Sequence, residues 1–473
     1  MGIRLFLIRC RGVHGIEYSA SMIGKSIVWS VLASTLVIAF ADYRLPGGET
    51  TVFDASREAF TQPADNLNPR DFARFFSGDT LFNTNWVSAS SVVDGRDGLG
   101  PLFNTRSCSS CHFKDGRGEP PSLGKISDGF LVRLSLPGKG LEGGPKPHPI
   151  YGNQISVRAL QKAKPEAHVS IEYEHVNGSY PDGTSYSLLK PIIKIDNWGY
   201  GEPGNLLKSA RVASAVYGLG LLDAIADESI LALADPEDRD NNGISGRANR
   251  VWSPSKQTHS IGKYGWKANK ATLLDQAAGA FQGDIGITSP LFPEENHSLQ
   301  QLDSVLYPSG GNPEIENRDL EDVVFYLKTL APPSSRFTNQ ESYQSGKELF
   351  EMAKCSSCHT PRFQTRDDYS IQALAGQLIY PYTDLLLHDM GDGLADNRPD
   401  FEANGREWRT PPLWGIGLIP TVNRHSRLLH DGRARNIEEA ILWHGGEAES
   451  SKQAFMKLAR EQRRELLKFV RSL

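Results

Sequence analysis

Two identical pentapeptides constrain this chain more strongly than any other part of its sequence. Residues 108–112 and 355–359 both read Cys-Ser-Ser-Cys-His. Cys-x-x-Cys-His is the attachment pattern of a c-type haem, in which each thiol bonds one vinyl group of the porphyrin and the adjacent histidine binds the iron. The chain is therefore expected to carry two covalent haems, with His112 and His359 as proximal iron ligands. The predicted attachment residues are Cys108, Cys111, Cys355 and Cys358.

Two other uses of paired cysteines fit less well. A zinc ribbon places its two Cys-x-x-Cys units about 15–20 residues apart, whereas 243 residues separate Cys111 from Cys355. A thioredoxin-like redox motif lies in a βαβ unit and needs no histidine after its second cysteine. The repeated histidine favours haem over both.

The N-terminal 41 residues have the pattern of a secretory signal. Lys25 precedes an apolar run over residues 27–40, and residues 39–41 form a small-x-small cleavage site. Met22 is the expected start of translation, and the run is short for a membrane span. We therefore expect an exported, periplasmic protein without a membrane span; an uncleaved signal would instead anchor it to the membrane. Cys10 falls in this segment, so every cysteine of the mature chain belongs to a haem motif.

The net charge argues against polyanionic partners. The chain carries −5 at neutral pH and −8 once residues 1–41 are removed. Nucleic acid and anionic membrane surfaces attract basic proteins, so neither is an expected partner. A small basic redox protein would suit this charge as an electron donor.

The sequence around the two motifs predicts a mainly α fold of two fused class I cytochrome c-like domains. Gly-x-x-Leu-Phe, a common start of such domains, occurs at residues 78–82 and 346–350. In the first half, strand-like segments and a hairpin turn at residues 181–183 predict β-containing insertions. The expected division is a signal at 1–41, an N-terminal arm at 42–68, a first domain at 69–331, a linker at 332–340 and a second domain at 341–473.

A second repeat supports this duplication. Counting from Trp266 and from His430, an apolar residue follows at +7 and an acidic residue at +9 in both halves. Two copies of a haem motif, each followed by this turn and helix, indicate a duplicated domain.

Five stretches carry a family resemblance. They are Gly-Pro-Leu-Phe-Asn-Thr-Arg-Ser-Cys at 100–108, Gly-Ile-Ser-Gly-Arg-Ala-Asn at 243–249, Gly-Trp-Lys-Ala at 265–268, Trp-Arg-Thr-Pro-Pro-Leu-Trp-Gly at 408–415 and Leu-His-Asp-Gly-Arg-Ala at 429–434. The chain resembles the bacterial dihaem cytochrome c peroxidase superfamily, which includes the methylamine dehydrogenase maturation enzyme MauG. It is most similar to the dihaem peroxidase family also called thiol oxidoreductases. The thiol label gains no support, because the mature chain has no thiol outside the haem motifs.

The resemblance implies which side chains hold the second iron. In the peroxidases a His-Asp-Gly turn at the cofactor, here at His430, is followed fourteen residues on by a methionine ligand. MauG-like enzymes have a tyrosine there, and this chain has His444. The resemblance thus implies His359 and His444 as axial ligands, with Met390 as the rival sixth ligand. A solvent-facing His444 at a helix end is the plainer alternative.

The resemblance also implies a peroxide site at the first haem. The relatives have a tryptophan between the haems and a glutamine and a glutamate over the distal face. The matching residues are Trp266, Gln276 and Asp284. A carboxylate beside an open iron can take one proton of peroxide and return it to the leaving oxygen. The plainer alternative makes Trp266 a core aromatic and the other two solvated helix residues.

Two further groups of side chains have open assignments. Asp238, Asp240 and Asn242 stand at alternate positions before a glycine, as in the first half of an EF-hand loop. Calcium and a plain Asx-rich turn both suit that loop, whose twelfth position is Asn249 instead of glutamate. A distal histidine could also close the first iron's sixth position, and the spacing selects none of His148, His168, His175, His297 and His425.

The expected function is that of a peroxidase-type oxidoreductase. Hydrogen peroxide would be reduced at the His112 haem, with electrons passed through the His359 haem. Three alternatives stay open: a MauG-like oxidase that modifies a partner protein, an electron-transfer cytochrome with two six-coordinate irons, and a haem protein that binds a ligand without turnover. The sixth position at the first iron separates peroxide chemistry from electron transfer.

Overall fold

Helices and strands both contribute to the fold. In the computed structural model, which describes residues 43–92, 95–301 and 307–473, 29% of the residues are helical and 20% lie in strands. The chain is therefore mixed α and β, and the expectation of a mainly α fold was wrong, because the first half forms long paired strands. The predicted signal segment lies outside the described residues. Among the described helices, none is both long and apolar enough to cross a bilayer.

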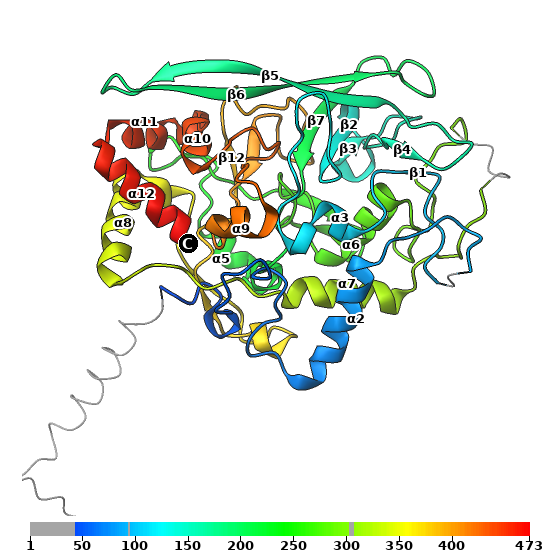
Figure 1. Ribbon diagram of the computed structural model, residues 1–473, viewed down its shortest axis with the longest axis horizontal. Coiled ribbons are helices and arrows are strands. Elements are labelled where there is room, and N and C mark those ends of the chain that lie inside the picture. The colour runs from blue at the N-terminus through cyan, green and yellow to red at the C-terminus, as the bar shows by residue number, and fades with distance from the viewer. Residues whose placement is uncertain (1–42, 93–94, 302–306) are drawn as a thin grey trace, which may run out of the picture. The chain divides into compact units, whose positions relative to one another are not determined.

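The α-helices are short, and the longest of them stand in pairs. Figure 1 shows α2 beside α7, and α8 beside α12. The helices are α2 (Phe72–Asn83), α3 (Cys108–Cys111), α4 (Leu219–Asp223), α5 (Asp227–Leu231), α6 (Leu273–Ala280), α7 (Asn317–Thr329), α8 (Gln340–Met352), α9 (Ile419–Asn423), α10 (Ile437–Leu442), α11 (Glu449–Lys457) and α12 (Arg460–Ser472).

The strands form small antiparallel sheets. One sheet has three strands in the order β3-β2-β7, and the others are pairs: β1 with β4, β5 with β6, β8 with β9, β10 with β11, and β12 with β13. The strands are β1 (Leu102–Phe103), β2 (Phe130–Lys139), β3 (Pro145–Lys146), β4 (Arg158–Ala159), β5 (His168–Ser179), β6 (Ser185–Asp196), β7 (Leu207–Val212), β8 (Arg250–Ser253), β9 (Thr258–Ile261), β10 (Phe363–Gln364), β11 (Leu378–Ile379), β12 (Leu387–Asp389) and β13 (Glu407–Arg409).

One helix pair packs beside each haem motif. In the first half α2 packs against α7, and in the second half α8 packs against α12. Each pair meets at a glycine. A β-carbon on Gly78 would clash with Asp322 and Tyr326, and a β-carbon on Gly346 would clash with Phe469. Glycine is therefore required at both positions, because any side chain would hold the two helices apart.

The phenylalanine four residues after each glycine connects the helix pair to the motif histidine. The Phe82 ring lies 6.2 Å from the imidazole of His112 and 5.4 Å from the ring of Tyr326 on α7. Phe350 lies 6.4 Å from the imidazole of His359 and repeats the contact with its partner helix. The two Gly-x-x-Leu-Phe segments thus occupy equivalent places in the two halves.

The β3-β2-β7 sheet has two faces with different surroundings. Alternation along β2 directs Phe130 and Val132 into a small hydrophobic core shared with β5. Leu131 and Arg133 therefore lie on the opposite face. Arg211 of β7 is the register partner of Leu131, so this second face carries two arginines.

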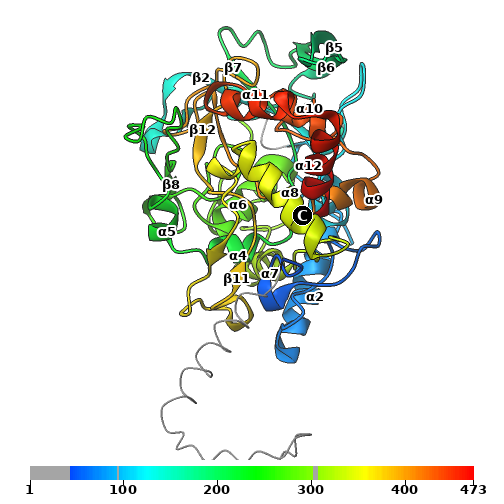
Figure 2. The same ribbon diagram turned by 90° about the vertical axis from the view of Figure 1, so that its left-hand side faces the viewer.

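The β5–β6 ribbon extends across both halves of the chain (Figure 1), and Figure 2 views it from its end. The strands pair over their whole length, which confirms the hairpin expected around residues 181–183. The turn is held by the second half, because the Tyr180 hydroxyl donates to Glu438 at 2.7 Å and Arg463 donates to Asp182 at 2.6 Å.

The predicted arm at 42–68 and linker at 332–340 pack against each other. Val52 forms a parallel bridge with Pro333, and Phe60 is fully buried. One hydrophobic core runs through both halves, and residues 43–473 form one compact unit. The division into two cytochrome domains stays a prediction.

Candidate functional site

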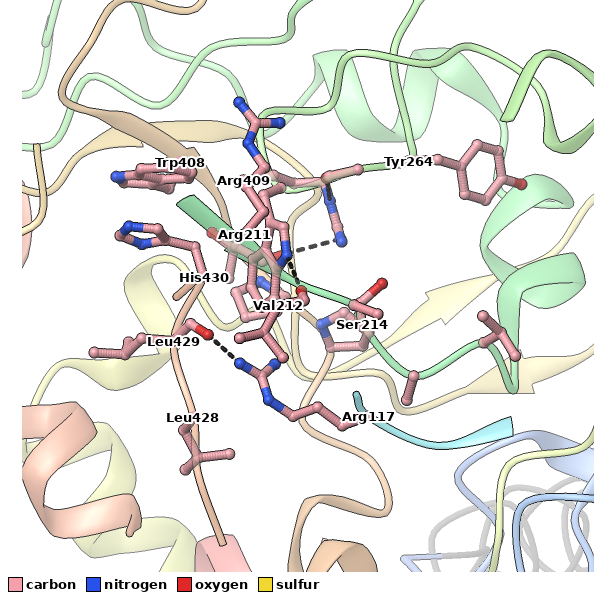
Figure 3. A pocket seen from close by; sticks show the side chains of 18 of the residues that line it. Arg117, Arg211, Val212, Ser214, Tyr264, Trp408, Arg409, Leu428, Leu429 and His430 are labelled. Carbon is pink, nitrogen blue, oxygen red and sulfur yellow. Dashed lines mark hydrogen bonds between the residues drawn. The ribbon is translucent and has the colours of Figure 1, made fainter. Parts of the chain in front are cut away.

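Both haem motifs line a single internal cavity of about 420 Å³. Its walls come from both halves of the chain, although 243 residues separate the motifs in the sequence. Figure 3 shows one part of this wall, where Trp408 stacks on His430 and Arg117 lies below them. The motif residues that line the cavity are Cys108, Cys111, His112, Cys355, Cys358 and His359.

Each motif folds into a tight turn that brings its thiols and its histidine to the cavity. The first motif is the single helical turn α3, which Ser107 caps with its hydroxyl. The His112 N–H donates to the carbonyl of Cys108, and the His359 N–H donates to the carbonyl of Cys355, both at 2.9 Å. The local backbone bond of the motif is therefore the same in both halves.

The two motif imidazoles are held as metal ligands usually are. The Nδ1 of His112 lies 2.7 Å from the carbonyl oxygen of Ser214, and the Nδ1 of His359 lies 2.9 Å from that of Tyr382. A carbonyl only accepts, so Nδ1 carries the proton and Nε2 keeps its lone pair. Burial lowers the pKa of both imidazoles, that of His359 to about 4, which keeps them neutral.

The charges of the cavity suit two haems. Among the described residues, seven basic side chains and one acidic side chain, Asp284, line it. Each haem brings two propionates, and buried carboxylates need such counter-charges. Burial raises the pKa of the Cys108 and Cys355 thiols to about 12, so they stay protonated until they react. The residues present fit two haems. The basic residues are Arg117, Arg133, Arg211, Lys270, Lys354, Arg409 and Lys452.

His444 lies in the cavity close to His359. It follows α10, which Asn436 caps at its start. The Nδ1 of His444 donates to the Ala440 carbonyl at 2.7 Å, so its Nε2 is left with a lone pair. The nearby His444 lowers the pKa of His359. This effect is smaller than those of burial and of the hydrogen bond to the Tyr382 carbonyl. Met390 lines the same cavity, so both predicted candidates for the sixth ligand reach it.

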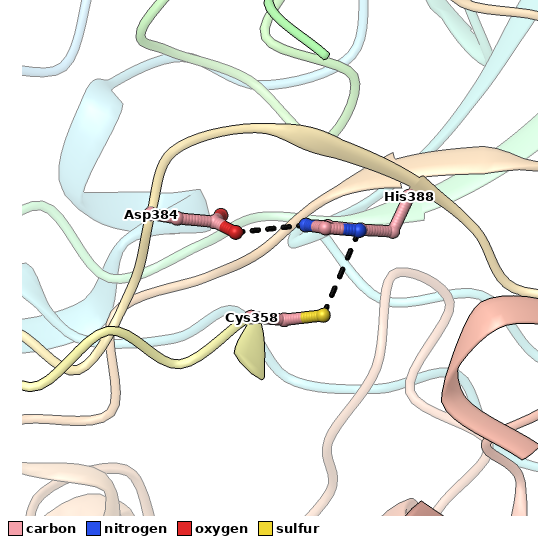
Figure 4. A group of neighbouring side chains, drawn as sticks. All are labelled: Cys358, Asp384 and His388. Atoms are coloured by element: carbon pink, nitrogen blue, oxygen red, sulfur yellow. Dashed lines mark hydrogen bonds and ion pairs between the residues drawn. The ribbon is translucent and has the colours of Figure 1, made fainter. Parts of the chain in front are cut away.

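His388 is a further cavity histidine, which the motifs did not single out. Its Nε2 lies 2.8 Å from Asp384 and its Nδ1 lies 2.7 Å from Glu447, while the Cys358 sulfur lies 3.6 Å from Nδ1. Figure 4 shows His388 with Asp384 and Cys358. Burial opposes the charged form, yet the two carboxylates outweigh it and hold the pKa of His388 well above its ordinary value. Both nitrogens are engaged, so His388 offers no lone pair. Its only signal in the sequence is its place two residues before Met390.

The predicted distal residues lie together at the first motif. Gln276 on α6 and Asp284 both line the cavity. Asp284 belongs to the π-helical turn Phe281–Ile285, which follows α6 directly. Its Oδ1 accepts a hydrogen bond from Gln154 Nε2 at 2.7 Å, and its charge raises the pKa of both first-motif thiols. No motif pointed to Gln154, which reaches Asp284 from a distant loop.

Two aromatic groups line the cavity that both motifs share. Trp266 lines the cavity, its Nε1 donates to the Val212 carbonyl at 2.8 Å, and the Arg117 guanidinium lies 5.1 Å from its ring centre. The His430 ring stacks on Trp408 at 3.7 Å, and burial lowers the pKa of His430 to about 4. Both predicted residues therefore reach the cavity, and their polar contacts fix their orientation.

The histidines left open by the sequence do not reach the cavity. Within the described chain, the histidines that line it are His112, His359, His388, His430 and His444. The charged side chain that acts on the pKa of His112 is Asp284, which raises it. No second histidine of the described residues acts on this pKa. The five open candidates His148, His168, His175, His297 and His425 therefore lie outside the cavity.

The acidic loop brings three carboxylates together. Oxygens of Asp235, Asp238 and Asp240 lie within 4.8 Å of one another. Asp235 was missed by the EF-hand comparison, because it precedes the first loop position. The Asn242 oxygen accepts from the backbone N–H of Ile244 at 2.7 Å, so this predicted ligand is engaged in the loop itself. Asn249, at the twelfth position, is buried and bonded elsewhere.

A protein-family model and a solved structure each match most of the chain. The family model described as "Di-haem oxidoreductase, putative peroxidase" matches residues 40–135 and 143–473. Among solved structures, hydrazine synthase from Kuenenia stuttgartiensis, pressurised with 20 bar xenon, is similar with a TM-score of 0.35 and 14% identity. That match covers 97% of this chain and 100% of the other. No curated protein matches the sequence.

Proposed function

The chain belongs to the di-haem oxidoreductase family, as its motifs predicted, and we propose that it reduces hydrogen peroxide at the haem of its first motif. Each haem is attached through the two thiols of its motif, with His112 or His359 as the proximal ligand. A reduced redox protein in the periplasm supplies two electrons. With two protons, these convert one hydrogen peroxide to two water molecules.

A difference between the two ends of the cavity supports this assignment. At the second motif, His444 offers a free imidazole nitrogen close to His359. At the first motif, among the described residues, the charged side chain that acts on the pKa of His112 is Asp284, and no histidine acts on it. An iron with two protein ligands transfers electrons, whereas an iron with one can bind a substrate. The first haem is thus the substrate site and the second is the electron-transfer site.

Asp284 is the proposed acid–base group. Gln154 holds its Oδ1, and no side chain of the described residues bonds its Oδ2. That oxygen can take one proton of peroxide and return it to the leaving oxygen, which is general acid–base catalysis. A haem held by this motif would supply the redox chemistry, while Asp284 holds and returns the proton.

Trp266 is the proposed intermediate stop for electrons. It lines the cavity that both motifs share, and its indole N–H is fixed by the Val212 carbonyl. A rigid aromatic ring in this place shortens each electron step between the haems.

We also propose that calcium binds the acidic loop. The carboxylates of Asp235, Asp238 and Asp240 lie within 4.8 Å of one another. Like charges at such distances repel, and calcium prefers clustered carboxylate oxygens.

Low-temperature EPR of the diferric protein, and then of the half-reduced protein, tests the proposal. We expect a high-spin ferric signal from the first haem in at least one state, and its loss when peroxide is added. The second haem should stay low-spin while oxidised. Two low-spin signals in the diferric protein, with no high-spin signal in either state and no response to peroxide, would show an electron-transfer cytochrome instead.

A further inference from the structure

Two basic side chains at the first-haem end of the cavity have no anionic partner. The side chains of Arg133 and Lys270 line the cavity, and within the described chain neither makes a hydrogen bond or an ion pair. The other arginines of the cavity are engaged. Arg117 and Arg409 donate to main-chain carbonyls, and Arg211 donates to a carboxylate.

The fold places these two cations beside Asp284. Arg133 forms a backbone bridge with Gln154, and Gln154 donates to Asp284 at 2.7 Å. Burial lowers the pKa of Arg133, and Asp284 is the largest opposing influence. Burial lowers the pKa of Lys270 most, and the charge of Arg133 lowers it further; the charges of Asp275, Asp400 and Asp284 oppose this shift, in that order. The Lys270 ammonium lies 5.7 Å from the Phe292 ring centre, which supplies only a weak contact.

We propose that Arg133 and Lys270 form an anion-binding subsite beside Asp284, which holds small anionic ligands at the first haem. The proposal rests on the function given above and adds the charge class of the ligand. A buried cation with no bonded counter-ion is costly, so two such cations near Asp284 favour the uptake of an anion.

Peroxide itself can supply that anion. When hydrogen peroxide gives one proton to Asp284, a hydroperoxide anion remains and the carboxylate becomes neutral. The two cations then lose the negative charge of Asp284 and gain the hydroperoxide in its place. Arg133 and Lys270 thereby stabilise the deprotonated ligand, while Asp284 keeps the proton for the leaving oxygen.

A propionate of the first haem is the other carboxylate-like group that could meet these cations. The two sources differ in one measurable property. A subsite for free anions discriminates between charged and neutral ligands added to the protein. If the cations instead pair with a propionate, replacing them changes the reduction potential of the haem. The preference for charged over neutral ligands is then unaffected.

The test is an optical titration of the dihaem protein with azide, an anion, and with imidazole at a pH where it is neutral. Arg133→Leu and Lys270→Met should each weaken azide binding by roughly tenfold or more, which corresponds to about 1.4 kcal/mol. Imidazole binding should stay within about threefold of wild type. Arg133→Lys should retain most of the azide affinity, which also shows that the site tolerates substitution. Lys139→Met, an exposed cation on the same strand, controls for net charge.

The outcomes separate the two proposals. Unchanged azide affinity in Arg133→Leu and Lys270→Met, with or without a shifted reduction potential, would overturn the anion subsite alone. Equal weakening of azide and imidazole would also overturn it, because that pattern reports a damaged pocket. If the wild-type protein binds neither ligand in the diferric or half-reduced state, the first iron is closed and the proposed function itself fails.

Discussion

Replacing Asp284 by asparagine should slow peroxide reduction by about 10²- to 10⁴-fold, the usual contribution of a positioned acid–base group. The corresponding rise in the activation barrier is about 2.7–5.4 kcal/mol. The two side chains have nearly the same shape, and the asparagine oxygen can still accept from Gln154. Folding should therefore be little affected, so that the loss reports the missing proton acceptor.

The assay is steady-state peroxide reduction by the dihaem protein with a reduced artificial electron donor. Asp128→Asn is the matched control, because this carboxylate lies near the first motif yet is 42% exposed and paired with Arg158. The control should retain wild-type turnover. The reasoning is refuted if Asp284→Asn stays within about threefold of wild type, or if Asp128→Asn loses as much activity.

Four further outcomes follow from the same structure. His444→Ala should convert the oxidised second haem from low-spin to high-spin, as read by EPR. Gly346→Ala should lower the free energy of unfolding by about 1–3 kcal/mol through overpacking of α8 on α12, whereas Gly283→Ala, which meets open space, should cost less in the same melts. Burial raises the pKa of Glu166 to about 8 from an ordinary 4.5. The folded state therefore holds that proton more tightly, and stability should fall as pH rises between these values. Glu166→Gln should reduce that fall in melts at pH 5 and pH 8. Calcium should raise the melting temperature of wild type more than that of Asp240→Asn.

The parts of the site that could be predicted from the sequence are those set by short spacings. The two motifs fix their thiols and histidines within five residues, and the family resemblance placed His444 fourteen residues after the turn at His430. Gln276 and Asp284 follow Trp266 along one helix and its terminal turn. In each case local backbone geometry carries the side chain to the cavity.

The residues that sequence reasoning missed are brought in by contacts between distant segments. Arg133 lies beside Asp284 because β2 pairs with the loop that holds Gln154. His388 meets Glu447 across 59 residues. The spacing of these residues in the sequence does not predict such pairs. The strand content is higher than predicted for the same reason. The β5–β6 ribbon is stabilised by packing on β2 and by hydrogen bonds to the second half.

The helix pairs of the two halves have a consequence for the order of events during biogenesis. The helix that packs beside the first motif, α7, begins 205 residues after His112, and α12 begins 101 residues after His359. Synthesis at about 5–20 residues per second leaves roughly 10–40 s between the first motif and its closing helix, and about half that time for the second. During this interval each motif has no closing helix beside it. Once the closing helix docks, a porphyrin would have to displace it to enter, so haem attachment must precede docking. The rate of haem attachment therefore sets the fraction of chains that mature correctly.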